Sequence, residues 1–167
     1  MIVSLTGFMG CGKTCTGRAL AERLGWEFVD LDEYIVHKWG RSVPELFGEG
    51  ELFFRALEAE AVRDVIVMRQ VAGGDLVLAL GGGTLEITSV KPLILEQTVC
   101  IYLEAGESFL RGWLEGTESR RPMLASCDIS ALLERRRPVY ELAPYRVDAE
   151  LPPEQLLSAI LSKIPNC

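Results

Sequence analysis

The chain has 167 residues, 49% of them hydrophobic, which is enough for one compact domain with a sizeable core. Its net charge of −7 argues against a surface that binds nucleic acid or an anionic membrane, and allows only a concentrated basic pocket. No signal peptide is recognisable, and no apolar run reaches the roughly eighteen residues of a membrane span. We therefore expect a soluble, cytoplasmic monomer with no nucleic-acid or membrane partner.

The strongest motif is residues 7–14 (GFMGCGKT), which match the pattern G-x-x-x-x-G-K-[ST] after an apolar run and before helix-forming residues. Glycines in such a turn let backbone amides and the positive end of the next helix surround a polyphosphate. Lys13 would reach the β and γ phosphates, and the Thr14 hydroxyl would bind Mg²⁺. A glycine-rich turn with a chance lysine is the alternative. We interpret the motif as a nucleotide site.

The cysteines do not indicate a metal site or a disulfide framework. They are five in number, an odd count, and lack CxxC or Cys/His metal spacing. Free thiols in a reducing compartment are the simplest interpretation. Cys11 lies inside the phosphate motif, where a small side chain is sufficient, so we expect no catalysis from it.

Two carboxylates follow the second predicted strand. A helix over residues 12–24 should end at Gly25, and a strand over residues 26–29 then leads into Asp30-Leu31-Asp32. Because open α/β sheets bind ligands at the carboxyl ends of their strands, the pair could serve a metal and a proton acceptor near the phosphates. Asp is also common in helix caps, so the pair alone is weak evidence.

A long amphipathic helix carries the next candidate. Residues 33–39 should be helical, and a further helix should start at residues 42–45, where proline takes an early position. From residue 51 to about 69, apolar residues recur at spacings of three and four. On that helix Arg55 lies one turn after Glu51 and one turn before Glu58. These charges could pair on the surface, or hold the guanidinium group for a carboxylate ligand.

Three glycines follow the next buried strand. Residues 76–80 (LVLAL) are continuously apolar and run into Gly81-Gly82-Gly83. Such a run costs entropy unless the backbone approaches something closely, so we expect a ligand against bare amides; a flexible turn is the alternative. A helix over 87–96 and a strand over 99–103 should follow.

The candidate residues in the last third of the chain are arginines. After a helix over 106–114, residues 116–124 (GTESRRPML) form a loop whose Arg120 and Arg121 could neutralise a transferring phosphoryl group, or only solubilise the loop. A helix over 128–142 carries Arg135-Arg136-Arg137, of which at most two can reach one ligand. A strand over 145–147 and a helix over 152–164 end the chain.

In this order the motifs resemble those of the shikimate kinase family over residues 2–164. The resemblance is carried by GFMGCGKT, DLD at 30–32, GELFFRALE at 50–58, GGG at 81–83, RPML at 121–124 and RRRPVY at 135–140. It implies phosphoryl transfer from ATP to the 3-hydroxyl of shikimate, on the route to chorismate and the aromatic amino acids.

The resemblance also implies a fold and its moving parts. The fold is a three-layer α/β/α P-loop kinase domain spanning residues 1–167, with a five-stranded parallel sheet in order 2-3-1-4-5. Residues 33–63 would form a substrate-binding subdomain, and residues 113–124 a lid over ATP.

For the substrate, the resemblance implies that Arg55 and Arg136 bind the carboxylate, Gly82 and Gly83 line the pocket with amides, and Asp32 binds the hydroxyl and accepts its proton. Glu58 would orient Arg55.

For the nucleotide, Lys13 and Arg121 would stabilise the γ phosphoryl group, while Thr14 ligates Mg²⁺ and Asp30 binds it or its waters. The implied ATP-binding residues are Gly10, Cys11, Gly12, Lys13, Thr14, Cys15 and Arg121. Arg111 and Arg120 are both candidates for the adenine contact.

Other functions remain to be distinguished. A gluconate-type kinase would also need arginines for a carboxylate, although the GGG and GELFFR motifs favour shikimate. A non-catalytic nucleotide-binding regulator would keep the phosphate motif, but has no need of Asp32, Arg121 and Arg136 together. A nucleoside monophosphate kinase would usually have a longer lid.

Overall fold

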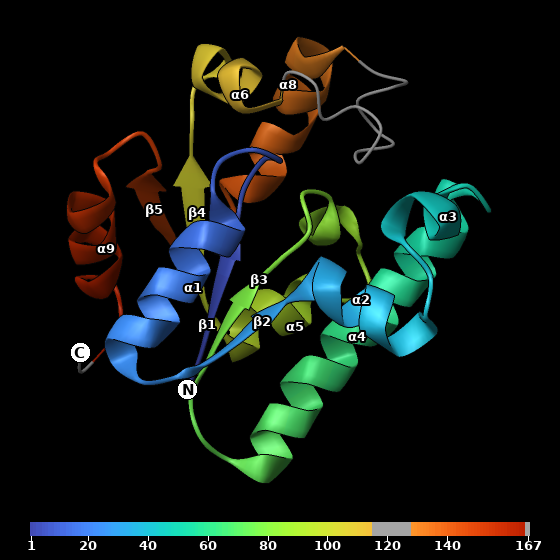
Figure 1. Cartoon of the computed structure of the whole chain (residues 1–167), viewed down its shortest axis with the longest axis horizontal. Helices are drawn as coiled ribbons and strands as arrows, with labels where there is room; N and C mark the ends of the chain where they lie inside the picture. Colours follow the sequence, from blue (N-terminus) through green and yellow to red (C-terminus); the bar gives the residue numbers. More distant parts are fainter. Residues whose placement is uncertain (115–127, 166–167) are drawn as a thin grey trace.

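The computed structural model of the chain describes residues 1–114 and 128–165. Within this part the chain forms a five-stranded parallel sheet in the order β2-β3-β1-β4-β5, with helices on both faces (Figure 1). This confirms the predicted architecture and strand order. The strands are β1 (Ile2–Thr6), β2 (Glu27–Asp30), β3 (Leu76–Ala79), β4 (Val99–Glu104) and β5 (Tyr145–Asp148).

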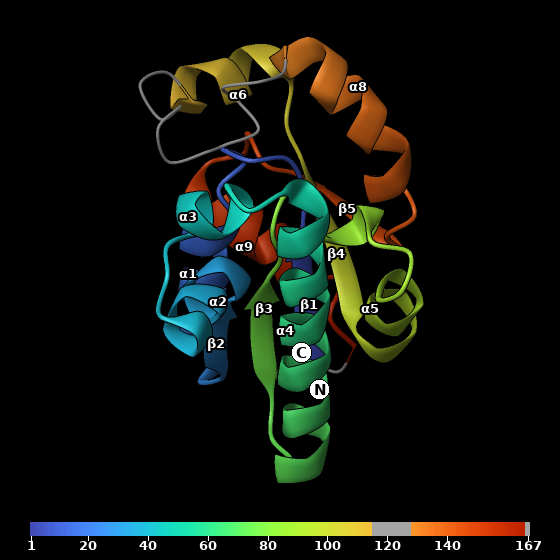
Figure 2. The ribbon, with the colours of Figure 1, turned by 90° about the vertical axis from the view of Figure 1, so that its right-hand side faces the viewer.

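The helices pack into two separate hydrophobic clusters, one on each face of the sheet (Figures 1 and 2). One cluster contains residues of α1, α6, α8 and α9, and the other contains residues of α2 to α5. The helices are α1 (Lys13–Leu24), α2 (Leu31–Trp39), α3 (Val43–Phe47), α4 (Glu51–Ala72), α5 (Lys91–Gln97), α6 (Glu107–Leu114), α8 (Ile129–Tyr140) and α9 (Pro153–Leu161), with a 3₁₀ turn η1 (Thr84–Glu86).

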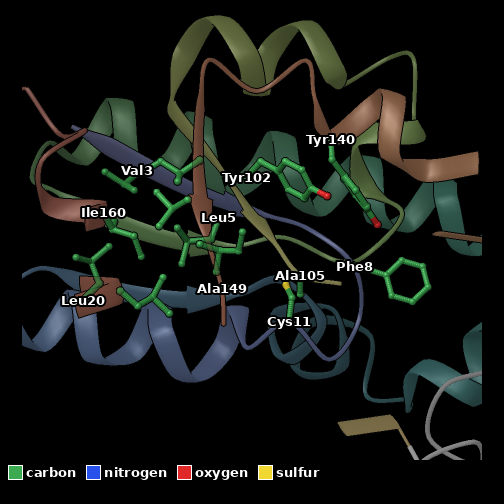
Figure 3. Packing of buried hydrophobic residues seen from close by; sticks show 14 of the residues in the cluster. Val3, Leu5, Phe8, Cys11, Leu20, Tyr102, Ala105, Tyr140, Ala149 and Ile160 are labelled. Carbon is green, nitrogen blue, oxygen red and sulfur yellow. The ribbon is translucent and has the colours of Figure 1, made fainter. Parts of the chain in front are cut away.

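Alternation along the central strand fills both clusters. Val3 and Leu5 of β1 pack with Leu20 of α1 and Ile160 of α9 (Figure 3), whereas Ile2 belongs to the opposite cluster. All five residues of β1 are therefore buried. This double burial explains why apolar residues occupy both faces of the strand, with only the small polar Ser4 and Thr6 between and after them.

All five strands end at the same edge of the sheet, and α6 and α8 lie over that edge (Figure 1). The phosphate motif follows β1, Asp30 ends β2, and the three glycines come shortly after β3. The topology thus brings three motifs that are far apart in sequence to one place. Within the described residues, none of the helices has both the length and the apolar character needed to span a membrane.

One predicted helix is wrong at its start. The helix predicted over 87–96 begins only at Lys91, as α5, and the turn η1 precedes this region. Pro92 occupies the first turn of α5, where its missing N–H is harmless, and the β-branched Ile87, Thr88 and Val90 before it are poor helix formers. Asp32 also differs slightly from expectation, because it lies in the first turn of α2 and not between the strand and the helix.

Candidate active site

The phosphate motif forms the predicted turn between β1 and α1. Gly12 has a left-handed φ of 91°, a conformation that strains other residues. The Lys13 ammonium group donates to the carbonyl oxygens of Gly7 at 2.7 Å and Phe8 at 3.0 Å. It is thus folded onto the loop, where a phosphate could replace these carbonyls as its partner.

A cavity of about 830 Å³ opens beside this loop, within the size range of small-molecule sites. Asp30, Asp32, Gly81 and Gly82 line one part of it. All the predicted ATP-binding residues of the loop also line it, namely Gly10, Cys11, Gly12, Lys13, Thr14 and Cys15. The fold therefore places the motifs after β1, β2 and β3 around one space.

The two carboxylate oxygens of Asp30 have different partners, one in a helix cap and one in the phosphate loop. Its Oδ1 accepts from the backbone N–H groups of Asp32 at 3.0 Å and Glu33 at 3.2 Å, which caps α2. Its Oδ2 accepts from the Thr14 hydroxyl at 2.6 Å. Helix capping and a ligand role, which the sequence left as alternatives, are therefore compatible in the same side chain.

Asp32 has the electrostatic environment of a proton acceptor. Loss of water around the carboxyl group raises its pKa to about 6, helped by the negative charges of Glu58 and Asp30. Lys13 and Arg55 oppose this rise. Asp32 is exposed as a residue and lines the cavity, so its carboxyl group loses water to the surrounding cavity walls and not through burial in the core. A carboxylate with a raised pKa is a stronger base, yet remains mostly ionised at neutral pH.

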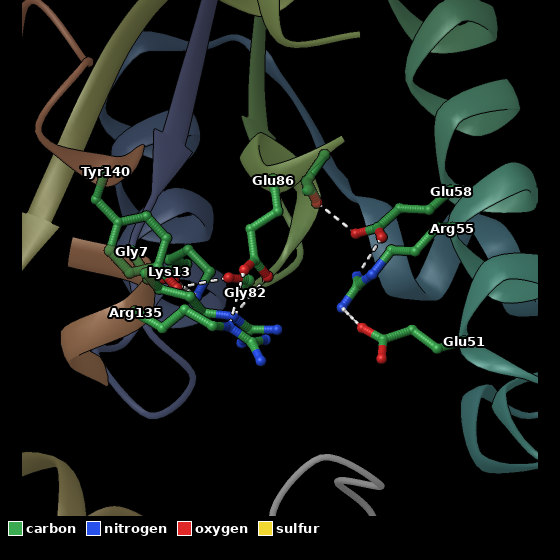
Figure 4. Close-up of polar contacts among 11 residues, drawn as sticks. Gly7, Lys13, Glu51, Arg55, Glu58, Gly82, Glu86, Arg135 and Tyr140 are labelled. Atoms are coloured by element: carbon green, nitrogen blue, oxygen red, sulfur yellow. Dashed lines mark hydrogen bonds and ion pairs between the residues drawn. The ribbon is translucent and has the colours of Figure 1, made fainter. Parts of the chain in front are cut away.

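Arg55 is held by carboxylates on its own helix. Its Nη1 donates to Glu58 Oε2 at 2.5 Å, and its Nη2 lies 3.4 Å from Glu51 Oε1. Glu58 is fully buried, and its Oε1 accepts from the buried Thr84 hydroxyl of η1. Figure 4 shows the Arg55 guanidinium turned from α4 toward the group that contains Glu86 and Arg135.

Arg136 is the one arginine of its triplet that is buried, with 1% of its surface exposed. Its Nε donates to Glu86 Oε2 at 2.8 Å. Its Nη1 and Nη2 are buried and have no hydrogen-bond partner among residues 1–114 and 128–165. Arg135 is more than half exposed and lies 3.4 Å from Glu86. The triplet thus sends one guanidinium group inward, with two donors unused.

The three glycines make room for these side chains. A Cβ atom on Gly83 would lie 2.4 Å from Arg55 Nη2, and one on Gly81 would lie 2.5 Å from Glu58 Oε1. A Cβ on Gly82 would lie 3.4 Å from Arg136 Nη1. The close approach expected from the sequence is therefore present, and protein groups already account for it.

Comparison with known proteins agrees with this geometry. A family model described as shikimate kinase matches residues 9–165. The chain belongs to the shikimate kinase family. A shikimate kinase of Salinibacter ruber is 39% identical over 177 residues, covering 98% of this chain and 84% of the relative.

Solved structures extend the match beyond sequence. A shikimate kinase from Acinetobacter baumannii, solved in complex with shikimate, has a TM-score of 0.85 at 29% identity and covers 99% of this chain and 95% of its own. A gluconokinase from Sinorhizobium meliloti has a TM-score of 0.59 at 16% identity, covering 96% of this chain and 89% of its own. At that identity the gluconokinase shows a shared fold alone.

One end of the cavity is apolar, a feature that the sequence analysis did not identify. Phe109 and Trp113 of α6 line it together with Leu151, Pro152 and Pro153. Flat, apolar walls of this kind suit a nucleobase. The spacing of four between the two aromatic residues was the available signal, but it indicates a helix face that packs on the core equally well.

Of the two residues expected to contact adenine, the structure describes Arg111 but not Arg120. The Arg111 side chain bridges α6 and α8, with Glu107 at 2.6 Å and Ser130 at 3.1 Å, and it also lies 3.6 Å from Asp128. Arg111 does not line the cavity. Arg120 and Arg121, and the predicted lid beyond Leu114, lie outside the described residues.

Proposed function

We propose that this chain transfers the γ-phosphoryl group of ATP to the 3-hydroxyl of shikimate, giving shikimate 3-phosphate and ADP on the route to chorismate and the aromatic amino acids. Membership of the shikimate kinase family supports the reaction. The observation that carries the substrate is Arg136, whose buried Nη1 and Nη2 lack partners among the described residues. Two adjacent, unpaired guanidinium donors fit a carboxylate in bidentate fashion.

Arg55 would bind the same carboxylate from the other side of Gly82 and Gly83, whose amides would line the pocket. Support comes from the positions of these glycines, because a Cβ atom built on Gly82 would lie 3.4 Å from Arg136 Nη1 and one built on Gly83 would lie 2.4 Å from Arg55 Nη2. A substrate with one carboxylate and several hydroxyls then has its charged end fixed. Its 3-hydroxyl would point back toward Asp32.

In the reaction, Asp32 would accept the proton of the 3-hydroxyl as its oxygen attacks the γ phosphorus. The bond from that phosphorus to the β–γ bridging oxygen breaks, and ADP leaves with the electron pair. Lys13 would stabilise the charge on the moving group, which is where most of the catalysis of such transfers arises. We assign the same role to Arg121, on its match to the family motif.

We propose that Mg²⁺ binds through Thr14 and Asp30. Their side-chain oxygens lie 2.6 Å apart, and oxygen ligands are those that Mg²⁺ prefers. In the described part of the chain, no three His, Cys, Asp or Glu residues are grouped to hold a metal by themselves, so phosphate and water oxygens would complete the set. Bound there, Mg²⁺ would offset the negative charge of the phosphates.

We also propose that residues 33–63 move as a substrate-binding subdomain and residues 113–124 as a lid, in a cytoplasmic monomer. One ion pair within this range supports movement as a unit, because Lys38 of α2 pairs with Glu60 of α4 at 2.6 Å. Lys38 also pairs with Asp64, one residue beyond the range. The free thiols of Cys11, Cys15 and Cys100 fit a reducing compartment.

The test is release of ADP from Mg²⁺-ATP with shikimate, with gluconate, and with neither. We expect release that depends on shikimate and is lost in Asp32→Asn, which cannot accept the proton. Release with gluconate alone would replace the proposal with the gluconate-type reaction. ATP binding without release in any mixture would indicate a regulator.

A further inference from the structure

The turn η1 contacts Glu58, the carboxylate partner of Arg55, and itself contains Glu86, the carboxylate partner of Arg136. Its first residue, Thr84, is fully buried and donates its hydroxyl to Glu58, which in turn accepts from Arg55. Its last residue, Glu86, accepts directly from Arg136 Nε at 2.8 Å. Two guanidinium groups from helices 81 residues apart in sequence are thus tied to one three-residue turn.

The contacts leave particular atoms free. Glu86 occupies the Nε edge of Arg136, so only the pair Nη1 and Nη2 remains for a ligand. Glu58 occupies Nη1 of Arg55, and its own second oxygen is taken up by Thr84. Neither guanidinium group can therefore rotate without losing a charge-assisted hydrogen bond.

The glycines that lead into the turn also lie between the two helices. On the side of α8, the Tyr140 hydroxyl donates to the Gly82 carbonyl at 2.5 Å. On the side of α4, Glu58 lies so close to Gly81 that a Cβ atom there would be 2.5 Å from its Oε1. The turn and the glycines before it thus contact residues of both helices.

We propose that Thr84 and Glu86 are positioning residues that set the orientation of Arg55 and Arg136 for a single carboxylate. Thr84 acts through Glu58, and Glu86 acts directly. This inference rests on the proposed function of the pocket. It assigns selectivity for carboxylate substrates to a turn whose own side chains make hydrogen bonds within the protein.

The first test uses near-isosteric changes at Thr84. Thr84→Val removes the hydroxyl but keeps the shape, and Thr84→Ser keeps the hydroxyl. We expect Thr84→Val to raise the KM for shikimate about five- to tenfold with the KM for ATP unchanged, and Thr84→Ser to remain within about twofold of wild type. Thr98→Val is the control, because it also removes a hydroxyl with protein partners, 2.6 Å from Ser4 Oγ and 2.7 Å from the Ile94 carbonyl oxygen, at a position that does not line the cavity.

The second test separates positioning from charge at Glu86. Glu86→Gln keeps an acceptor for Arg136 Nε, whereas Glu86→Ala has none. Positioning predicts that Glu86→Ala raises the KM for shikimate about tenfold and that Glu86→Gln stays close to wild type. Equal effects of the two variants, or tighter shikimate binding in both, would overturn the role. Glu27→Gln, which removes a carboxylate paired with Arg69 far from the site, is the control.

Selectivity is measured as the ratio of kcat/KM for shikimate over its neutral carboxamide. We expect this ratio to fall in Thr84→Val and Glu86→Ala and to hold in the controls. An unchanged ratio with loss of melting temperature and of ATP affinity would mean a purely structural turn. If the wild type does not phosphorylate shikimate, the proposed function fails; if it does and the variants match it, only this inference fails.

Discussion

The phosphate loop takes its shape from its backbone, whereas the arginine pocket takes its shape from side chains. In the loop, Gly12 adopts a left-handed φ of 91°, and the nearest atom to a Cβ built there is 3.6 Å away. In the pocket, Gly83 has an ordinary φ of −115°, but a Cβ would lie 2.4 Å from Arg55. The same residue type is thus required for conformation in one region and for space in the other.

The difference determines how each region can be damaged. The loop is one contiguous segment, so its anion site depends on local conformation and on one lysine. The pocket joins α4, η1 and α8, and its donors are oriented by Glu58 and Glu86. Changes in the loop should therefore affect ATP and turnover, and changes in the pocket should affect shikimate.

The largest effect is expected from Lys13→Ala. It removes the cation nearest the phosphates, and loss of one such group typically lowers turnover by about 10²–10³-fold. Among the contacts described, the side chain bonds only within the loop, to the carbonyls of Gly7 and Phe8 and to Cys11 Sγ, so the fold should remain. Steady-state kinetics and circular dichroism check both parts. An unfolded variant would contradict the assignment of Lys13 to the ligand and not to the core.

A somewhat smaller effect on catalysis, with little effect on stability, is expected from Arg136→Met. A buried cation with two unused donors is costly, and Glu86, which loses Arg136 as a partner in the variant, still lies 3.4 Å from Arg135. We expect the KM for shikimate to rise about 10²-fold while the free energy of unfolding in urea is largely kept. A strongly destabilised variant would mean that Arg136 supports the fold.

Paired glycine substitutions sharpen the comparison directly. Gly83→Ala should displace Arg55 and raise the KM for shikimate about tenfold, with ATP affinity retained. Gly12→Ala should do the reverse, because a left-handed alanine costs about 1–3 kcal/mol at the phosphate loop. Binding of each ligand is measured for both variants. The same loss of both ligands in either variant would remove the distinction between the two regions.

The smallest effect is expected at an ion pair outside both regions. Glu27 of β2 pairs with Arg69 of α4, and its side chain is 58% exposed. Exposed pairs of this kind contribute only about 0–1 kcal/mol. Glu27→Gln should therefore leave both KM values unchanged and shift the urea midpoint slightly. A large change in either KM would show that the regions are coupled through the sheet.

The loop was predictable because its signals are local. The motif over residues 7–14 fixed the turn, and Gly25 correctly marked the end of α1. Apolar periodicity likewise placed Arg55 on a helix, although α4 extends to Ala72, three residues beyond the prediction. The sheet order followed from the family resemblance, not from strand patterns.

The pocket was only partly predictable, because its contacts join distant segments. The roles of Arg55 and Arg136 were expected from family motifs, but the burial of Arg136 depends on how α8 packs against η1. Glu86 was missed because the predicted helix began nearby and gave its carboxylate no special position. Trp113 was missed because an aromatic residue on an amphipathic helix indicates core packing as readily as a ligand site.

The most direct measurement is calorimetric titration of wild type and Arg55→Ala with shikimate and, separately, with Mg²⁺-ATP. Arg55 donates charge-assisted hydrogen bonds of about 1.5–3 kcal/mol each, so the account predicts that shikimate affinity falls about 10- to 100-fold. ATP affinity should stay within about twofold. Equal loss of both affinities, or an unchanged affinity for shikimate, would contradict the claim that phosphate and carboxylate are bound by separately built regions.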